Sequence, residues 1–448
     1  MAVRATGRQN GHCDFEPNDD PLTASTEVGP IRQLLSDPNF RNFWIAQVLM
    51  FGVNGTVRFA FVWLMVTLTD WSAAEGLIGI AYGVPALLVS LPAGAWSDRV
   101  DRRRFFLIWA LISAALFATF AVVVAMDLAT PRIAGVAAVL LGTALVVLSP
   151  NLNAIVPLLV PPERLINAAA LQNGGGQAAG FLGLAIGGLL IQWVGNAGSF
   201  AMMSGICLIA CVLMWPVKIP EPQASPAGPS AEAQVGAGAE PEEQAEARTG
   251  LLAEVWAGLR YGLGREPSRT LLLASLMLGA SFSVMQIAMP RVVEEEFQRD
   301  SGAAGLLLGT FGLGMLVSSM WMARRSGHIR HGRNVALFIG VGLGMGQFLL
   351  SFAVSYWMAV AIMVAWGLNA GVAIASHRTL LQQSTEPAMM GRVMGIMVLG
   401  FSGGLPFGAL TQALLAPAIG PVLTMRTVGL VTMAITIPLT WRKVIRTA

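Results

Sequence analysis

Arg58 is a charged residue within an apolar stretch of the sequence, FGVNGTVRFAFVWLM. Asn54 precedes it by four positions, so the two side chains point the same way if the stretch is helical. An unpaired guanidinium in a membrane costs about 3 kcal/mol or more on insertion scales, so Arg58 needs a partner or water. Two interpretations follow: Arg58 binds an anionic or polar amphipathic molecule in a central cavity, or it snorkels to the membrane surface and bonds helix carbonyls.

A second concentration of charge is the segment GAWSDRVDRRR, from Gly94 to Arg104, which holds two carboxylates and four arginines. Asp98 can form ion pairs with these arginines and hold a neighbouring helix end in one conformational state. In the simpler alternative, the arginines only anchor the loop on one side of a membrane. A carboxylate at a membrane boundary is costly without a partner, which favours a gating role. The gating candidates are Gly94, Asp98, Arg99, Arg102 and Arg103.

Other polar residues within apolar stretches extend the candidate binding surface. The substrate-cavity candidates are Asn54, Arg58, Gln172, Asn173, Gln177, Gln286 and Asn369. Some of them would instead bridge helices through hydrogen bonds worth about 0.6 kcal/mol each. No carboxylate lies deep in an apolar stretch, so the candidates for proton coupling are boundary acids. These are Glu294, Glu295 and Glu296.

The remaining reactive residue types do not form a catalytic or metal-binding pattern. The four histidines lie in predicted loops or tails, or at the end of an apolar stretch. Cys207 and Cys211 are four apart with no third ligand nearby, which is typical of small residues on one helix face. The sequence has no phosphate-binding loop and no basic patch with interleaved aromatic residues. We therefore expect no enzyme activity, no cofactor, no bound metal and no nucleic-acid partner.

Long apolar stretches must position these residues. Apolar residues make up 55% of the chain and charged residues 12%, as in membrane proteins. Each stretch has about 20 residues or more, which is enough to span a bilayer as a helix. We predict an all-α membrane protein of twelve transmembrane helices in two six-helix bundles. The stretches are Phe43–Leu68, Gly76–Trp96, Phe105–Met126, Ile133–Leu159, Ile166–Val194, Ser199–Val217, Leu271–Pro290, Gly302–Ala323, Val335–Ser355, Tyr356–Ser376, Val393–Pro417 and Ile419–Trp441.

The sequence divides into five predicted parts. They are a disordered cytoplasmic tail (1–40), an N-terminal six-helix bundle (41–217), a flexible cytoplasmic linker (218–250), an interfacial helix with the C-terminal six-helix bundle (251–442), and a cytoplasmic tail (443–448). The linker is rich in Pro, Ala, Gly and Glu and cannot bury enough apolar surface to fold. Alternate loops carry 23 of the 28 Lys and Arg residues, which places both chain ends in the cytoplasm of a cell-membrane protein.

The two halves contain a weak internal repeat. PLLVPPERLINAA and QQSTEPAMMGRVM precede the fifth stretch of their halves, and Pro162 and Pro387 are offset by 225 residues. Repeats of this parallel kind build transporters around a central cavity. Glycines follow in both halves and allow close helix packing or a hinge. The packing or hinge candidates are Gly183, Gly187, Gly188, Gly404, Pro406 and Gly408.

GAWSDRVDRRR resembles the signature loop of the major facilitator superfamily, with Asp101 in place of the usual second glycine. The matching positions are Gly94, Asp98, Arg99, Arg102 and Arg103. Gly183, Gly187 and Gly188 are similar to its antiporter motif, with Leu184 in place of the proline. The segments DPNFRNFWIAQ, LINAAALQN and MGRVMG resemble the branch that contains the enterobactin exporter and macrolide efflux permeases. The resemblance extends from about Pro38 to Arg442.

The resemblance implies two helical bundles that rock about a central site and expose it alternately to each side of the membrane. It implies a proton-coupled secondary exporter of a small molecule, such as a siderophore-like anion or an amphipathic drug. The expected partners are that substrate, the lipid bilayer and a proton, and the expected state is a monomer. An importer or uniporter of a small metabolite, and a transporter-like receptor or scaffold, remain as alternatives. RRSGHIRHGR, the equivalent loop of the second half, lacks a carboxylate, so gating should centre on the first half.

Overall fold

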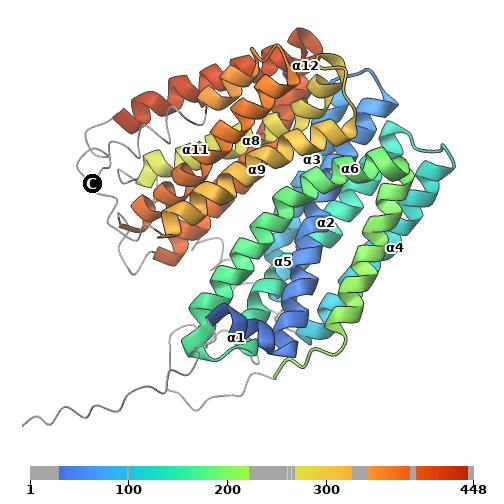
Figure 1. Cartoon of the computed structure of the whole chain (residues 1–448), viewed down its shortest axis with the longest axis vertical. Coiled ribbons are helices and arrows are strands. Elements are labelled where there is room, and N and C mark those ends of the chain that lie inside the picture. The colour runs from blue at the N-terminus through green and yellow to red at the C-terminus, as the bar shows by residue number, and fades with distance from the viewer. Residues whose placement is uncertain are drawn as a thin grey trace, which may run out of the picture.

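The computed structural model describes residues 30–97, 100–220, 260, 264, 268–324, 342, 344–383 and 390–441. Every element in these ranges is a helix (Figure 1). The elements are α1 (Pro30–Ser36), α2 (Pro38–Leu68), α3 (Ala73–Ser97), α4 (Arg102–Ala125), α5 (Pro131–Leu159), the short 3₁₀ helix η1 (Pro162–Arg164), α6 (Leu165–Met214), α8 (Ser268–Glu295), α9 (Ser301–Arg324), α11 (Tyr356–Gln383) and α12 (Met390–Trp441).

Eight helices in the described ranges are long and apolar enough to cross a membrane. The prediction of an all-α membrane protein is therefore confirmed. Most of the predicted stretch Val335–Ser355 lies outside the described residues, as do both predicted tails for the most part and the linker from residue 221 onward. Large apolar side chains such as Leu111, Val122 and Val136 are exposed on the outer helix faces, as expected where lipid covers the protein.

Short polar residues fix where several helices begin. The Asp37 side chain accepts a hydrogen bond from the Asn39 backbone N–H and caps α2. Asp101 caps α4 by accepting from the Arg104 N–H at 2.8 Å, and Thr130 caps α5. The role of Asp101 as a cap accounts for its presence where the signature loop of the superfamily usually has glycine.

The helices α6 and α12 are each interrupted by a glycine in the left-handed region. Gly195 in α6 has φ 71°, and Gly420 in α12 has φ 81°. A side chain at either position would be strained, because L-residues rarely adopt positive φ. The two glycines are 225 positions apart, the same offset as Pro162 and Pro387. This shared break supports the internal repeat.

The helix α6 begins and ends on the same side of the molecule. It starts beside the end of α5, where the Asn151 amide donates to the backbone carbonyl of Arg102 at the start of α4. Its last turn is followed by Trp215, whose carbonyl accepts a hydrogen bond from the Arg103 guanidinium. The chain therefore turns back at Gly195.

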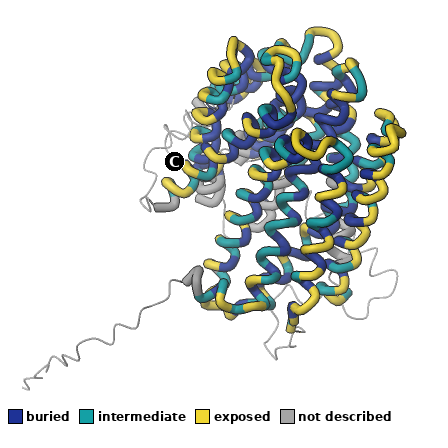
Figure 2. The backbone as a smooth tube through the Cα atoms, turned by 45° about the vertical axis from the view of Figure 1, so that its right-hand side comes forward, coloured by how far each residue is buried: buried dark blue, intermediate teal, exposed yellow. Residues whose placement is uncertain are grey.

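The described helices form two groups, α2 to α6 and α8 to α12 (Figure 1). In the first group α2 is central and largely buried, whereas α4 and α5 have exposed outer faces (Figure 2). Aromatic rings of this group pack around Phe200, which lies 4.8 Å from Phe120 and 5.4 Å from Phe61 between ring centroids. Most contacts between the two groups are made by α6 with α9 and by α3 with α12, and α8 adds smaller contacts with α2 and α3.

Candidate functional site

The two groups of helices touch along one side of the molecule and diverge toward the other. Successive turns of α6 meet successive turns of α9 there, and the contact pairs are Gln192–Gly302, Gly188–Gly305, Ala185–Gly309 and Phe181–Gly312. Further toward the start of α6 the contact stops, since a β-carbon on Gly174 would meet nothing within 4 Å and Asn173 is exposed. Figure 1 shows α6 and α9 meeting near α3 and separating beyond it. We call the side with Gly188 the closed end and the side where α6 begins the open end.

The contact between α3 and α12 widens in the same direction. A β-carbon on Gly76 would lie 2.4 Å from the Ala413 nitrogen, and one on Gly83 would lie 3.8 Å from the nearest atom, in Pro406. The helix backbones therefore touch at the closed end and are further apart one or two turns away. The α6–α9 contact and the α3–α12 contact therefore both widen from the closed end toward the open end.

An ion-paired cluster joins the two groups at the closed end. The Arg291 Nε donates to Glu75 at 2.5 Å, its Nη1 to Glu295 at 2.9 Å, and its Nη2 to the Thr69 carbonyl at 2.7 Å. Glu75 and Thr69 belong to the first group, and Arg291 and Glu295 to α8 of the second. The Glu75 and Arg291 side chains are 0% and 3% exposed, so this is a buried ion pair. Losing one partner of such a pair is strongly destabilising, because the other charge stays buried.

Glu75 is a buried acid in the first turn of α3 and lies just before the predicted membrane stretch Gly76–Trp96. Its Oε2 atom is buried and has no hydrogen-bond partner. Burial raises the pKa of the Glu75 carboxyl to about 7, against the opposing effect of Arg291. The site can therefore bind or release a proton near neutral pH.

A second set of contacts at the closed end is uncharged or exposed. Gln192 of α6 donates to the Asp300 carboxylate at 2.6 Å, and the Ser301 hydroxyl donates to the Gly188 carbonyl at 3.1 Å. The Gln192 and Asp300 side chains are exposed. Both contacts cross between α6 and the start of α9.

Two cavities lie between the groups, next to the closed end. The larger has a volume of about 230 Å³ and the smaller about 50 Å³. Both are lined by Arg58, Leu184 and Gln286, so Arg58 stands where they meet. The polar residues of the larger cavity are Asn54, Arg58, Gln177 and Gln286, and its aromatic residues are Phe51, Phe181, Phe282, Phe311 and Phe401.

Arg58 faces an aromatic ring instead of a carboxylate. Its guanidinium carbon lies 5.6 Å from the centroid of the Tyr82 ring, within cation–π range. Neither cavity has an acidic residue in its lining. Across the described residues, no ion pair forms with Arg58, so the positive charge is available to a ligand.

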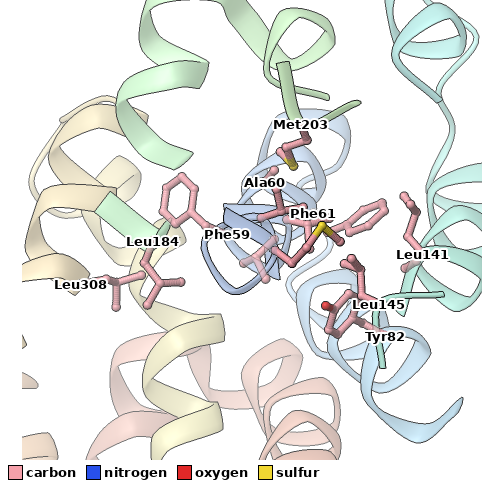
Figure 3. Close-up of a cluster of buried hydrophobic side chains, with 14 of the residues drawn as sticks. Phe59, Ala60, Phe61, Tyr82, Leu141, Leu145, Leu184, Met203 and Leu308 are labelled. Carbon is pink, nitrogen blue, oxygen red and sulfur yellow. The ribbon is translucent and has the colours of Figure 1, made fainter. Parts of the chain in front are cut away.

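Phe59, the next residue of α2, lines the smaller cavity. Its side chain points toward Leu184 of α6 and Leu308 of α9, whereas Phe61 points away toward Leu141 (Figure 3). In the lining of the larger cavity, the centroid of the Phe282 ring lies 6.0 Å from that of Phe181 and 5.7 Å from that of Phe311. The cavity thus offers one cation, a few amides and several aromatic faces.

The structure brings together four of the seven predicted cavity residues: Asn54, Arg58, Gln177 and Gln286. The other three lie elsewhere. Gln172 is buried and donates to the Leu152 carbonyl and to Asn153 of α5. Asn173 bonds its own helix at the Ala169 carbonyl, and Asn369 lies against Gly342.

The predicted gate is described only in part. Asp98 and Arg99 lie outside the described residues, as does most of RRSGHIRHGR, and the surroundings of Gly94 within α3 are also outside them. Arg103 lies over the Trp215 ring at 5.6 Å and bonds the carbonyl that follows α6. The gating role of this loop stays a prediction.

The predicted packing or hinge residues lie in close helix contacts. Gly183 and Gly187 face α2, and Gly188 faces α9 of the other group. Gly404 and Gly408 face α8, and Pro406 lies near Gly83 of α3. The left-handed breaks occur at Gly195 and Gly420, which the sequence analysis did not single out.

Of the predicted coupling acids, Glu295 bonds Arg291, Glu294 is half-buried and Glu296 is exposed. Sequence reasoning missed Glu75 and Arg291 as a pair. One indication was available: Arg291 is among the few basic residues predicted to lie on the outer side of the membrane.

Comparison with known proteins gives a consistent result. A family model described as "Transmembrane secretion effector" matches residues 26–446. An uncharacterised MFS-type transporter of Sinorhizobium fredii is 24% identical over 351 residues, which cover 75% of this chain and 78% of the relative.

Two solved structures are similar in fold. A bacterial homologue of the human lysosomal transporter Spinster, inward-facing and unoccupied, has a TM-score of 0.66 at 13% identity and covers 89% of this chain and 96% of its own. The nucleoside transporter NupG has a TM-score of 0.66 at 14% identity, with 90% and 97% covered. At these identities the likeness concerns the fold alone.

Proposed function

Because the chain belongs to the major facilitator superfamily and is a multi-pass membrane transporter of that type, we propose that it exports a small molecule from the cytoplasm by alternating access. It has twelve transmembrane helices in two six-helix bundles and acts as a monomer in the cell membrane, with both termini in the cytoplasm. The description of its family as a secretion effector supports export over import.

The observation that carries the substrate class is Arg58, which lines both cavities, lies over the Tyr82 ring and forms no ion pair among the described residues. A charged hydrogen bond contributes about 1.5–3 kcal/mol, which corresponds to roughly ten- to a hundredfold in affinity. The substrate is therefore an anion or an amphipathic molecule with an acidic group. The phenylalanines of the cavity favour an apolar or aromatic body for the rest of that molecule.

The wedge between the two helix groups corresponds to one state of the transport cycle. Under the positive-inside rule, the open end faces the cytoplasm and the closed end faces outward. A cytoplasmic substrate reaches Arg58 from the open end, and release requires the closed end to part. Coupling to a proton supplies the driving force for this cycle.

The test measures accumulation of an anionic probe, 2,3-dihydroxybenzoate, and a cationic probe, tetraphenylphosphonium, in cells with and without the protein. We expect lower accumulation of the anion, and loss of the difference when the proton gradient is collapsed. Arg58→Gln should lower the rate of export of the anion at least tenfold. Arg132 is an exposed arginine at the start of α5, and Arg132→Gln should keep the wild-type rate. Equal export of the anion by Arg58→Gln at equal surface expression would contradict the assignment.

A further inference from the structure

We propose that Glu75 carries the coupling proton. Binding of this proton favours the state in which the two helix groups touch at the closed end. This inference rests on the proposed function, since a coupling proton acts only in a transport cycle. It moves the coupling site from the boundary acids Glu294 to Glu296 to a carboxylate that lies between the two helix groups. The argument starts from the position of that carboxylate.

Glu75 is held by a residue of the opposite group, so its environment must change when the closed end parts. Arg291 moves with α8 and keeps Glu295, which lies one turn away on the same helix. Glu75 moves with α3 and leaves a site in which it is 0% exposed. The Glu75 carboxylate thus alternates between a buried contact without water and an exposed position in water, as a coupling site requires.

The net charge of the cluster favours the binding of a proton. The charged groups that act on Glu75 are Arg291, Glu294 and Glu295 of α8, and Asp70 acts in turn on Glu294. In the turn of α3 after Glu75, α12 contributes the apolar residues Ala409 and Ala413. Glu75 and Glu295 share one guanidinium, so the three groups carry a net charge of −1 when both acids are ionised. A proton on the free Oε2 of Glu75 makes the buried cluster neutral.

The smaller cavity lies about one helical turn inward from this cluster, and we assign the path of the proton to it. Ile78 and Gly79, one turn after Glu75, and Ile287, one turn before Arg291, line the cavity of about 50 Å³. A water needs about 10–15 Å³ of such space, so a short water chain fits. The same cavity reaches Arg58 and Gln286, which also line the larger cavity. The proton that binds to Oε2 from outside can therefore leave toward the open end, and Glu75 returns to its ionised form.

The direction of the pH effect follows from the pKa values. In the closed state the pKa of Glu75 is about 7, against 4.5 for an ordinary glutamate in water. The proton therefore binds more tightly to the closed state, so closure is favoured as the pH falls through 7. The ratio of closed to open molecules should change by about tenfold per pH unit in this window, and the effect saturates below 4.5.

The experiment measures the distance across the closed end by double electron–electron resonance in the full-length protein in lipid nanodiscs. Spin labels replace Trp193 and Val354, which are 74% and 89% exposed and belong to different groups, in a chain without its native cysteines. We expect the short-distance population to grow as the pH is lowered from 8.5 to 5. Glu75→Gln should remove this response and remain closed at every pH.

Two matched variants keep the result interpretable. Asp300→Asn alters an exposed acid that also contacts the opposite group, and it should retain the full pH response. Glu75→Asp retains an acid, so a shifted response in this variant supports the proposal even if Glu75→Gln does not fold.

An unchanged pH response in Glu75→Gln, or no response in the wild-type protein, would overturn the proposal. No substrate is needed for this measurement, so it can succeed or fail independently of the export of the anionic probe.

Discussion

Two contacts at the closed end occupy equivalent places in the two halves of the chain, and the acid beside each contact has a different partner. Gly76 touches Ala413, and Ser301 touches Gly188. An offset of 225 residues relates Gly76 to Ser301 and Gly188 to Ala413, the same offset that relates Gly195 to Gly420. The fold thus repeats the same contact twice. At this interface the two halves therefore correspond residue by residue.

The acids that precede these contacts are also equivalent by this offset, yet their surroundings differ. Glu75 is buried against Arg291, whereas Asp300 is exposed and accepts a hydrogen bond from a neutral Gln192. A duplicated backbone therefore positions two acids alike, and the residue opposite each one decides its role. One contact can respond to pH, and the other serves as its internal control.

The largest expected effect comes from reversing the charge at the ion-paired contact. Arg291→Glu would place a third carboxylate beside Glu75 and Glu295, so the closed end should open and transport of the anionic probe should fall more than tenfold. The double variant Glu75→Arg with Arg291→Glu restores an opposite pair and should recover part of the activity. Transport assays and the spin-label distance report both effects. A double variant as defective as Arg291→Glu alone would show that the pair does not hold the halves together.

An intermediate effect is expected from adding a side chain at either of the equivalent contacts. A β-carbon on Gly188 would lie 2.3 Å from the Ser301 carbonyl oxygen, and one on Gly76 would lie 2.4 Å from the Ala413 nitrogen. Gly188→Val and Gly76→Val should therefore lengthen the distance across the closed end and slow transport severalfold. Gly174→Val is the control, since a β-carbon there meets nothing within 4 Å. A normal closed-end distance in both contact variants would contradict the close contact.

The smallest effect is expected from Asp300→Asn. Exposed polar pairs contribute little, because solvent screens them and the side chains lose freedom when they pair. Transport and thermal stability should remain close to those of the wild-type protein, within about twofold in rate. A loss of transport as large as that expected for Arg291→Glu would contradict the distinction between the two equivalent acids.

The sequence was sufficient to predict the eight membrane helices that the described residues contain and the shared helix face of Asn54 and Arg58, because both depend on local information. Long apolar stretches specify membrane helices, and the four-residue spacing of Asn54 and Arg58 places both on one face, which lines the cavity. The break at Gly195 falls between two predicted apolar stretches, whereas the break at Gly420 lies just inside the last predicted stretch.

Contacts between distant segments could not be predicted in this way. Glu75 and Arg291 are 216 positions apart, and only the docking of the two helix groups brings them together. Gln172 and Gln177 lie on the same apolar helix, which has no polar face to show that one bonds α5 and the other lines the cavity. Helices that are apolar all round conceal which side faces a neighbour.

The reversals at Gly195 and Gly420 have a practical consequence for biochemical work on this molecule. At each one the chain turns back at a single glycine between two helices. A protease must bind several consecutive residues in an extended conformation, and so short a turn does not provide them. Proteolysis from the closed end should spare these two turns, and epitope insertions for surface labelling belong in other loops.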